Sequence, residues 1–186
     1  MGRDWTSLPD DLPVPVDDGA ADHLPGEALS SCPLPSTDGG LVDLAAAPGR
    51  TVVYAYPRTG EPGVDSPDGW DAIPGARGCT PQACAYRDHA EDLAAAGARV
   101  VGLSTQTTSY QCEAAGRLHL PFPLLSDADL TLARAWGLPT FEAGGEVLLR
   151  RLTLVLRDGV VEHVRYPVFP PDGDATAVLA WLQENQ

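Results

Sequence analysis

The sequence has little positive charge. Lys and Arg together number 12 against 26 Asp and Glu, which gives the 186-residue chain a formal net charge of −14 at pH 7. Proteins that bind a nucleic-acid backbone or an anionic membrane present clustered cations, because these replace the counterions of the phosphates. We therefore expect neither nucleic acid nor a membrane surface among the partners.

Long apolar runs are also lacking. No stretch of the sequence approaches the roughly 20 apolar residues of a membrane-spanning helix, and residues 1–18 do not combine a basic stretch with an apolar run. This pattern predicts a cytoplasmic protein. Cysteine is scarce, with four residues, and a cytoplasmic thiol pool keeps structural disulfides reduced. The cysteines are therefore expected to serve chemistry.

The composition changes at about residue 24. Residues 1–24 are acidic and contain proline, which predicts an extended or partly disordered arm. Residues 25–186 are patterned as one globular domain, long enough to bury a core without a disulfide or a structural metal. Turn-forming residues at 36–40 separate two apolar stretches, and this predicts a short hairpin that caps the edge of a sheet.

The rest of the chain alternates between strand and helix patterns. The β-rich runs 51–56 and 99–104 predict buried central strands, and the helical pattern at about 80–96 predicts a parallel crossover between them. Further helices are predicted at 107–118, 128–136 and 174–183, and an antiparallel hairpin at 148–156 and 160–165. The resulting order βαβαββα is that of an α/β thioredoxin-like fold, with a central mixed sheet flanked by helices.

The segment that begins at Gly78 carries the most chemical information. Thr80 is suited to an N-cap and Pro81 to the first helical position, which places Cys79 at the mouth of a helix. The unpaired N–H groups and the dipole of a helix N-terminus favour an anion, and lower the pKa of a thiol from about 8.5 to about 3.5–7.5. Cys79 is therefore a candidate nucleophile. The alternative is a small buried apolar side chain.

Cys84 lies five positions after Cys79 on the same predicted helix. At about 100° per residue the two side chains point about 140° apart, with their Cα atoms about 8 Å apart, beyond disulfide range. A bond between them requires the first turns to unwind. A zinc site needs four ligands, and only His89 lies nearby. The spacing also differs from the Cys-x-x-Cys of thioredoxin-type sites.

The run Gly78-Cys79-Thr80-Pro81-Gln82-Ala83-Cys84 resembles the active-site helix of peroxiredoxins of the bacterioferritin comigratory protein type, also called peroxiredoxin Q. Similarity extends from about residue 25 to the C-terminus, with matches at 86–88, 101–105, 122–127, 151–156, 158–159 and 161–164. The resemblance implies a thiol-dependent peroxidase that reduces hydrogen peroxide or organic hydroperoxides. It further implies thioredoxin or a similar dithiol as reductant, no metal or organic cofactor, and a monomer or weak dimer.

The resemblance also assigns roles to individual residues. It makes Cys79 the peroxidatic cysteine, which becomes a sulfenic acid, and Cys84 the resolving cysteine that condenses with it. Arg151 takes the position of the active-site arginine, which stabilises the thiolate and orients the peroxide. Pro57 matches the family proline that follows the first central strand. Arg150 is expected on the opposite face of the strand, because side chains alternate there.

Two departures from the family pattern stand out. Ala76 occupies the position of a threonine whose hydroxyl contacts the peroxide in the family, and Thr59 is the candidate to supply that group instead. Residues 58–78 contain an insertion between the family proline and the first cysteine. Trp70 in this insertion is expected either to line or cover the site, or only to anchor the loop.

Alternative functions remain open at this point. The same cysteine pair suits a redox sensor or a thiol-disulfide relay, and the insertion suits a scaffold specialised for transforming a small molecule. Cys112, on the predicted helix at 107–118, is a second candidate for the resolving cysteine, with inert packing as its alternative.

Overall fold

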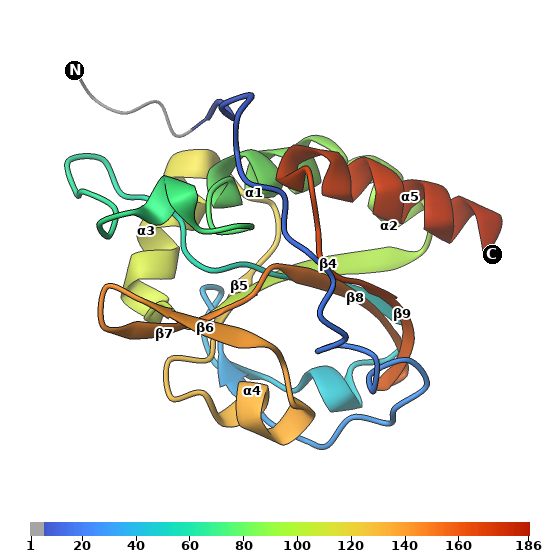
Figure 1. Ribbon diagram of the computed structural model, residues 1–186. Helices are drawn as coiled ribbons and strands as arrows, with labels where there is room; N and C mark the ends of the chain where they lie inside the picture. The colour runs from blue at the N-terminus through green and yellow to red at the C-terminus, as the bar shows by residue number, and fades with distance from the viewer. Residues whose placement is uncertain (1–5) are drawn as a thin grey trace.

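A mixed sheet of five strands forms the centre of the computed structural model, which describes residues 6–186 (Figure 1). In spatial order the strands are β5 (Leu124–Ser126), β4 (Ala98–Ser104), β3 (Arg50–Ala55), β8 (Leu152–Arg157) and β9 (Val160–Arg165). β3, β4 and β5 run parallel, whereas β8 pairs antiparallel with both β3 and β9. The predicted central mixed sheet is confirmed.

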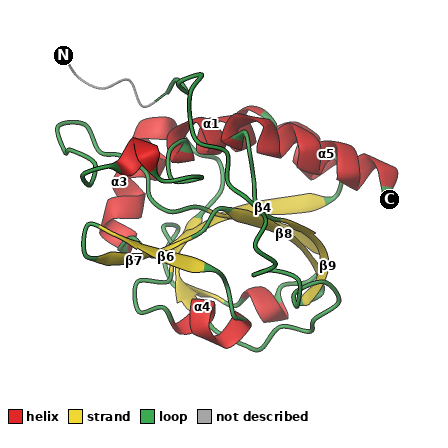
Figure 2. Ribbon diagram, viewed as in Figure 1, coloured by secondary structure: helices red, strands yellow, loops and turns green. Residues whose placement is uncertain are grey.

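Helices cover both faces of this sheet (Figure 2). On one side lie α1 (Cys79–Asp88), α2 (Ala90–Ala95) and α5 (Asp174–Glu184), and on the other lies α4 (Thr131–Trp136). α3 (Thr108–Leu118) packs against β5. Among residues 6–186, no helix combines the length and the apolar character needed to cross a membrane.

β3 shows why the sequence forms a sheet with two covered faces. All of its residues are buried. Val52 and Tyr54 pack into the core beneath α1 and α5, whereas Val53 and Ala55 pack into the core beneath α4. A continuous apolar run is what a strand needs when helices cover both of its sides.

Two small hairpins flank the sheet. β1 (Leu34–Pro35) pairs with β2 (Leu41–Val42), and the N–H of Thr37 in their turn donates to the carbonyl of Leu124 at 3.0 Å, so the predicted N-terminal hairpin does cap the β5 edge. β6 (Thr140–Ala143) and β7 (Glu146–Leu149) form a second hairpin that the sequence analysis missed. Short 3-10 helices complete the fold: η1 (Leu44–Ala46), η2 (Trp70–Ala72) and η3 (Pro171–Gly173).

Two element boundaries were predicted wrongly. The strand expected at 148–156 is interrupted at Arg150 and Arg151. Before the interruption β7 pairs with β6, and after it β8 pairs with β3. The Arg150 guanidinium carbon lies 5.8 Å from the centroid of the Phe141 ring, whereas Arg151 is buried. The two side chains differ in their surroundings because the chain passes from one sheet to another between β7 and β8, and not because side chains alternate along one strand. The helix expected at 80–96 is likewise divided, at His89, into α1 and α2.

Part of the predicted N-terminal arm packs on the rest of the chain. Ala21 and Leu24 are buried in the core on the α4 side. The hydroxyl of Tyr166 donates to the carboxylate of Asp18 at 2.8 Å. Residues 1–5 of the arm lie outside the described residues, and the domain boundary at residue 24 remains a prediction.

Candidate active site

Cys79 is the first residue of α1. The N-cap is Gly78, with φ 109° and ψ 16°, and the first helical hydrogen bond runs from the N–H of Gln82 to the carbonyl of Gly78 at 3.0 Å. The expected N-cap, Thr80, is therefore inside the first turn, and that prediction was wrong by two positions. Cys79 nevertheless lies among the N-terminal N–H groups, which have no partners within the helix.

Gly78 allows the helix to begin where it does. Its positive φ is strained for any residue with a Cβ, and a Cβ at this position would lie 2.3 Å from Cγ of Pro171 in η3. The start of α1 therefore packs directly on the turn that leads into α5.

Arg151 contacts the Cys79 sulfur. Its Nη2 lies 3.2 Å from Sγ and also donates to the carbonyls of Gly75, Ala76 and Arg77 at 3.1–3.2 Å, and its Nη1 donates to Oε1 of Gln82. Cys79 is 3% exposed, as is Arg151, and its sulfur also lies 3.7 Å from the carbonyl oxygen of Ala76. A guanidinium is always charged and only donates, so Arg151 presents a positively charged donor to the Cys79 sulfur.

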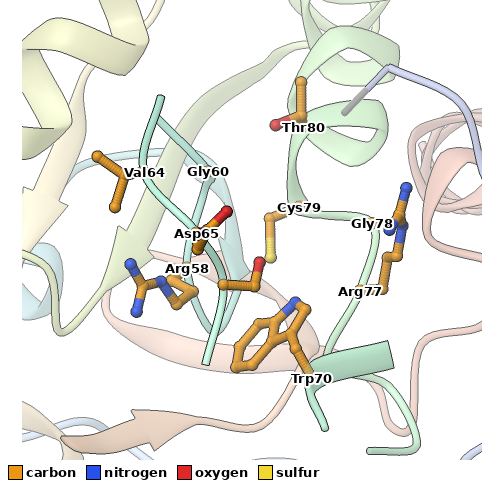
Figure 3. A pocket seen from close by; sticks show the side chains of 10 residues that line it. Arg58, Gly60, Val64, Asp65, Trp70, Arg77, Gly78, Cys79 and Thr80 are labelled. Carbon is orange, nitrogen blue, oxygen red and sulfur yellow. The ribbon is translucent and has the colours of Figure 1, made fainter. Parts of the chain in front are cut away.

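A small cavity opens beside the sulfur (Figure 3). Its volume is about 20 Å³, enough for one water-sized molecule. It is lined by Cys79 and its neighbours and by the inserted loop: Arg58, Gly60, Val64, Asp65, Ser66, Trp70, Arg77, Gly78 and Thr80. The loop that departs from the family pattern thus forms one wall of the site.

Trp70 has both of the roles considered for it. Its side chain is 4% exposed, packs near Phe141 with 6.2 Å between ring centroids, and shares a small core with Ala76 and Leu148. It also lines the cavity, and its indole faces the Cys79 sulfur in Figure 3. The residue therefore anchors the loop and limits the space in front of the thiol.

The hydroxyl missing at Ala76 is not supplied by Thr59. The Thr59 side chain donates instead to Oε1 of Gln106 at 3.2 Å, and the backbone N–H of Thr59 donates to the same oxygen at 3.0 Å. Thr80 and Ser66 both line the cavity and carry hydroxyl groups. Pro57 is buried directly after β3 and precedes Arg58 in the cavity wall.

Three tyrosines lie behind the site. Burial, the main cause, raises the pKa of Tyr54, Tyr56 and Tyr86 well above the ordinary value, and the rings of Tyr54 and Tyr86 stack with centroids 4.5 Å apart. A phenol with a raised pKa stays protonated at neutral pH. The hydroxyl of Tyr86 donates to the carboxylate of Asp174, whereas among residues 6–186 those of Tyr54 and Tyr56 have no hydrogen-bond partner, so these two side chains serve packing.

The sequence analysis missed a buried polar network beneath α1. Nε2 of Gln82 and the hydroxyl of Tyr86 both donate to the carboxylate of Asp174, at 3.0 and 2.7 Å. The spacing of Cys79, Gln82 and Tyr86 by three and four positions, which puts all three on one helix face, was the available signal. Their partner was invisible because Asp174 lies in α5, far along the chain.

The other cysteines lie apart from the Cys79 sulfur. Cys84 is half-buried on α1, and Cys112 is exposed on α3, with its thiol 4.0 Å from the carbonyl of Thr37. Cys32 is buried, and burial raises the pKa of its thiol. None of these four cysteines forms a disulfide in the structure. In the part of the chain that the structure describes, no group of three His, Cys, Asp or Glu could hold a metal.

Comparison with known sequences gives consistent matches. The sequence pattern of the Redoxin family covers residues 20–179. Chloroplastic peroxiredoxin Q of Oryza sativa subsp. japonica is 35% identical over 160 residues, which cover 85% of this chain and 66% of the rice protein. Peroxiredoxin Bcp of Escherichia coli (strain K12) is 32% identical over 165 residues, 86% of this chain and 96% of that protein. The chain thus spans just under two-thirds of the rice relative.

Solved structures show the same likeness. Peroxidoxin BcpB from Mycobacterium tuberculosis superposes with a TM-score of 0.70 at 29% identity, over 88% of this chain and 99% of that one. A peroxiredoxin Q structure from Xanthomonas campestris superposes with a TM-score of 0.64 at 24% identity, over 94% and 98% of the two chains. The expected thioredoxin-like fold is confirmed.

Proposed function

The chain belongs to the redoxin family and, within it, to the peroxiredoxin Q/Bcp group, and from this premise we propose that it is a thiol-dependent peroxidase. The observation that carries the proposal is the 3.2 Å contact between Nη2 of Arg151 and the Cys79 sulfur, at a helix N-terminus and beside a cavity of about 20 Å³. Hydrogen peroxide is only slightly larger than the water molecule that such a cavity holds.

In the first step the Cys79 thiolate attacks the terminal oxygen of a hydroperoxide. An S–O bond forms as the O–O bond breaks, and the departing alkoxide or hydroxide takes a proton from solvent. Arg151 faces the sulfur and is placed to stabilise the negative charge as it moves from sulfur to the leaving oxygen. The product at Cys79 is a sulfenic acid.

In the second step the Cys84 thiol attacks the sulfenic sulfur, and water leaves as the disulfide forms. Because both cysteines lie on α1, five positions apart, the first turns must unwind before the two sulfurs can meet. An external dithiol, of which thioredoxin is the type we favour, then reduces the disulfide by exchange. Exposed Cys112 remains a second candidate for the resolving role.

The remaining parts of the proposal concern the setting of the reaction. We place the protein in the cytoplasm, as a monomer or weak dimer that needs no cofactor.

Mass spectrometry of the peroxide-treated protein tests the mechanism. One equivalent of hydrogen peroxide is expected to give a disulfide between Cys79 and Cys84, because condensation follows oxidation of the first thiol. Cys84→Ser should instead leave Cys79 as a sulfenic or sulfinic acid, with Cys112→Ser as the matched control that retains the disulfide. A wild-type protein that peroxide leaves unoxidised, but that forms the disulfide with an oxidised dithiol protein, would favour the relay.

Trp70 is expected to select against bulky substrates. Trp70→Ala removes the indole wall of the cavity, so the rate constant for cumene hydroperoxide relative to that for hydrogen peroxide should rise roughly tenfold or more. Trp70→Leu is the milder companion, because truncating a buried Trp to Ala costs about 3–5 kcal/mol of stability.

The control for Trp70 is Phe141→Leu. Phe141 packs near Trp70 but belongs to the β6 strand and not to the wall of the small cavity. Its substitution should leave the substrate ratio unchanged. An equal shift in both variants would mean that loosening the loop, rather than removing the wall, decides selectivity.

A further inference from the structure

The buried carboxylate of Asp174 connects α5 to three other elements of the fold, α1, β8 and β9. It is the first residue of α5 and is 0% exposed. Its Oδ2 accepts hydrogen bonds from the Gln82 side chain at 3.0 Å, the Tyr86 hydroxyl at 2.7 Å and the Thr153 hydroxyl at 2.6 Å, and its Oδ1 accepts one from Nε of Arg165 at 2.9 Å. A buried carboxylate is stable only when donors surround it in this way.

The donors fall into two groups. Thr153 in β8 and Arg165 in β9 belong to the sheet, and they hold Asp174 from below. Gln82 and Tyr86 belong to α1, the helix that carries both Cys79 and Cys84. Asp174 therefore ties a helix that must unwind to a sheet that need not move.

The donor and acceptor groups of the side chains determine which residue donates in each hydrogen bond of this network. An ionised carboxylate only accepts, so Gln82 must present its Nε2 to Asp174, which leaves its Oε1 toward Arg151. A guanidinium only donates, so Arg151 can form a hydrogen bond with the amide oxygen of Gln82 but not with its amide nitrogen. Asp174 thus orients Gln82, and Gln82 in turn helps to hold the arginine that contacts the Cys79 sulfur.

Unwinding of α1 has to break the same contacts. Gln82 lies between the two cysteines and Tyr86 just beyond the second, so a helix that opens far enough to join the sulfurs separates its side chains from Asp174. The carboxylate then loses two of its donors while it stays buried on Thr153 and Arg165. This loss opposes unwinding, because hydrogen bonds to charged groups are stronger than those between neutral ones.

We propose that Asp174 is a positioning residue that latches α1 in its wound state, where Arg151 contacts the Cys79 sulfur, and whose release limits formation of the Cys79–Cys84 disulfide. The proposal rests on the proposed peroxidase function. It predicts opposite effects on two steps: a weaker latch speeds disulfide formation, whereas loss of the Gln82 contact slows the attack on peroxide. Nonspecific damage to the site would slow both.

The latch also bears on overoxidation. A Cys79 sulfenate that meets a second hydroperoxide attacks it, forming another S–O bond as the O–O bond breaks, and becomes a sulfinic acid while an alcohol or water leaves. This reaction competes with the arrival of Cys84. A tighter latch therefore exposes the sulfenate to the second peroxide for longer.

Tyr86→Phe is the variant that isolates the latch. It removes one hydroxyl that ties α1 to Asp174 and keeps the ring that stacks on Tyr54. Thr153→Val is its matched control, because it removes from the same carboxylate a donor that belongs to β8 and not to α1. Asp174→Asn is the second variant, which weakens every contact of the network at once.

The experiment follows each oxidation state of Cys79 by quenched-flow mass spectrometry after hydrogen peroxide is added. We expect Tyr86→Phe to form the disulfide on the order of tenfold faster, and to accumulate correspondingly less sulfinic acid at high peroxide, with Thr153→Val close to wild type. Asp174→Asn should also speed the disulfide step, but slow the first oxidation. Equal behaviour of Tyr86→Phe and Thr153→Val, or an unchanged disulfide rate in Tyr86→Phe, would overturn the proposal.

Hydrogen exchange separates the latch from the peroxidase function. In the absence of peroxide, the amides of α1 should exchange faster in Tyr86→Phe than in Thr153→Val. If peroxide oxidises no cysteine in the wild type, the proposed function fails and the exchange comparison still decides the latch. If peroxide oxidises Cys79 but α1 exchanges equally in both variants, the latch alone is refuted.

Discussion

Cys79→Ser is expected to abolish hydroperoxide consumption, with turnover falling on the order of 10⁴-fold or more, to the uncatalysed background. The nucleophile toward peroxide is a thiolate, and a serine hydroxyl in the same place stays protonated at neutral pH. The positive charge of Arg151 and the helix N-terminus then has no anion to act on. Loss of hydrogen peroxide in the presence of a thioredoxin system gives the measurement.

Cys32→Ser and Cys112→Ser are the controls for this prediction. One of these thiols is buried with a raised pKa and the other is exposed on α3, and neither adjoins the small cavity beside Cys79. Both variants should consume peroxide at rates within about twofold of wild type. Retained turnover in Cys79→Ser, or comparable loss in Cys32→Ser, would place the thiol that reacts with peroxide elsewhere. Comparable loss in Cys112→Ser would instead assign the resolving role to Cys112.

The position of Cys79 could be predicted because its determinants are local. Gly-Cys-Thr-Pro restricts the backbone over a few residues, and a proline just after a cysteine indicates a helix start whatever the rest of the chain does. The exact N-cap was missed because the positive φ of Gly78 depends on Pro171 of η3, which packs against it. A shift of two positions of this kind is set by tertiary contact.

The supporting network could not be predicted for the same reason. Gln82 and Asp174 are 92 positions apart in the chain, and only the packing of α5 against α1 brings them together. Thr59 was assigned wrongly because its partner, Gln106, comes from the loop after β4. Local patterns name the reacting groups, whereas the residues that orient them depend on which elements become neighbours.

The interruption at Arg150 and Arg151 shows a further limit of periodicity. The apolar residues on either side continue a strand pattern, so the sequence offers no sign that the chain changes from one sheet to another. This passage between sheets places Arg151 between two strands, where its side chain contacts three backbone carbonyls and the Cys79 sulfur. Adjacent arginines thereby acquire different surroundings, which makes them a natural pair for a test.

Arg151→Met is expected to lower the rate constant for the reaction of Cys79 with hydrogen peroxide by about 10²–10³-fold. Methionine fills a similar volume but removes the charge and the fork of donors that contacts the sulfur and Gln82. Arg151→Lys should recover part of this loss, because an ammonium supplies charge but cannot reproduce the two-armed geometry. The rate of sulfenic acid formation at low peroxide, followed by stopped flow, reports the effect.

The matched control is Arg150→Met, which removes a neighbouring charge that stacks on Phe141 and does not contact the sulfur. Its rate constant should stay within about twofold of wild type, because the half-buried Arg150 guanidinium packs on Phe141 and not on the reacting thiol. Arg151→Met also leaves the carbonyls at 75–77 without this donor, and that of Ala76 is buried, so both variants are compared below their unfolding temperatures. Equal losses in the two variants would mean that overall positive charge, and not the contact between Nη2 and Sγ, drives the reaction.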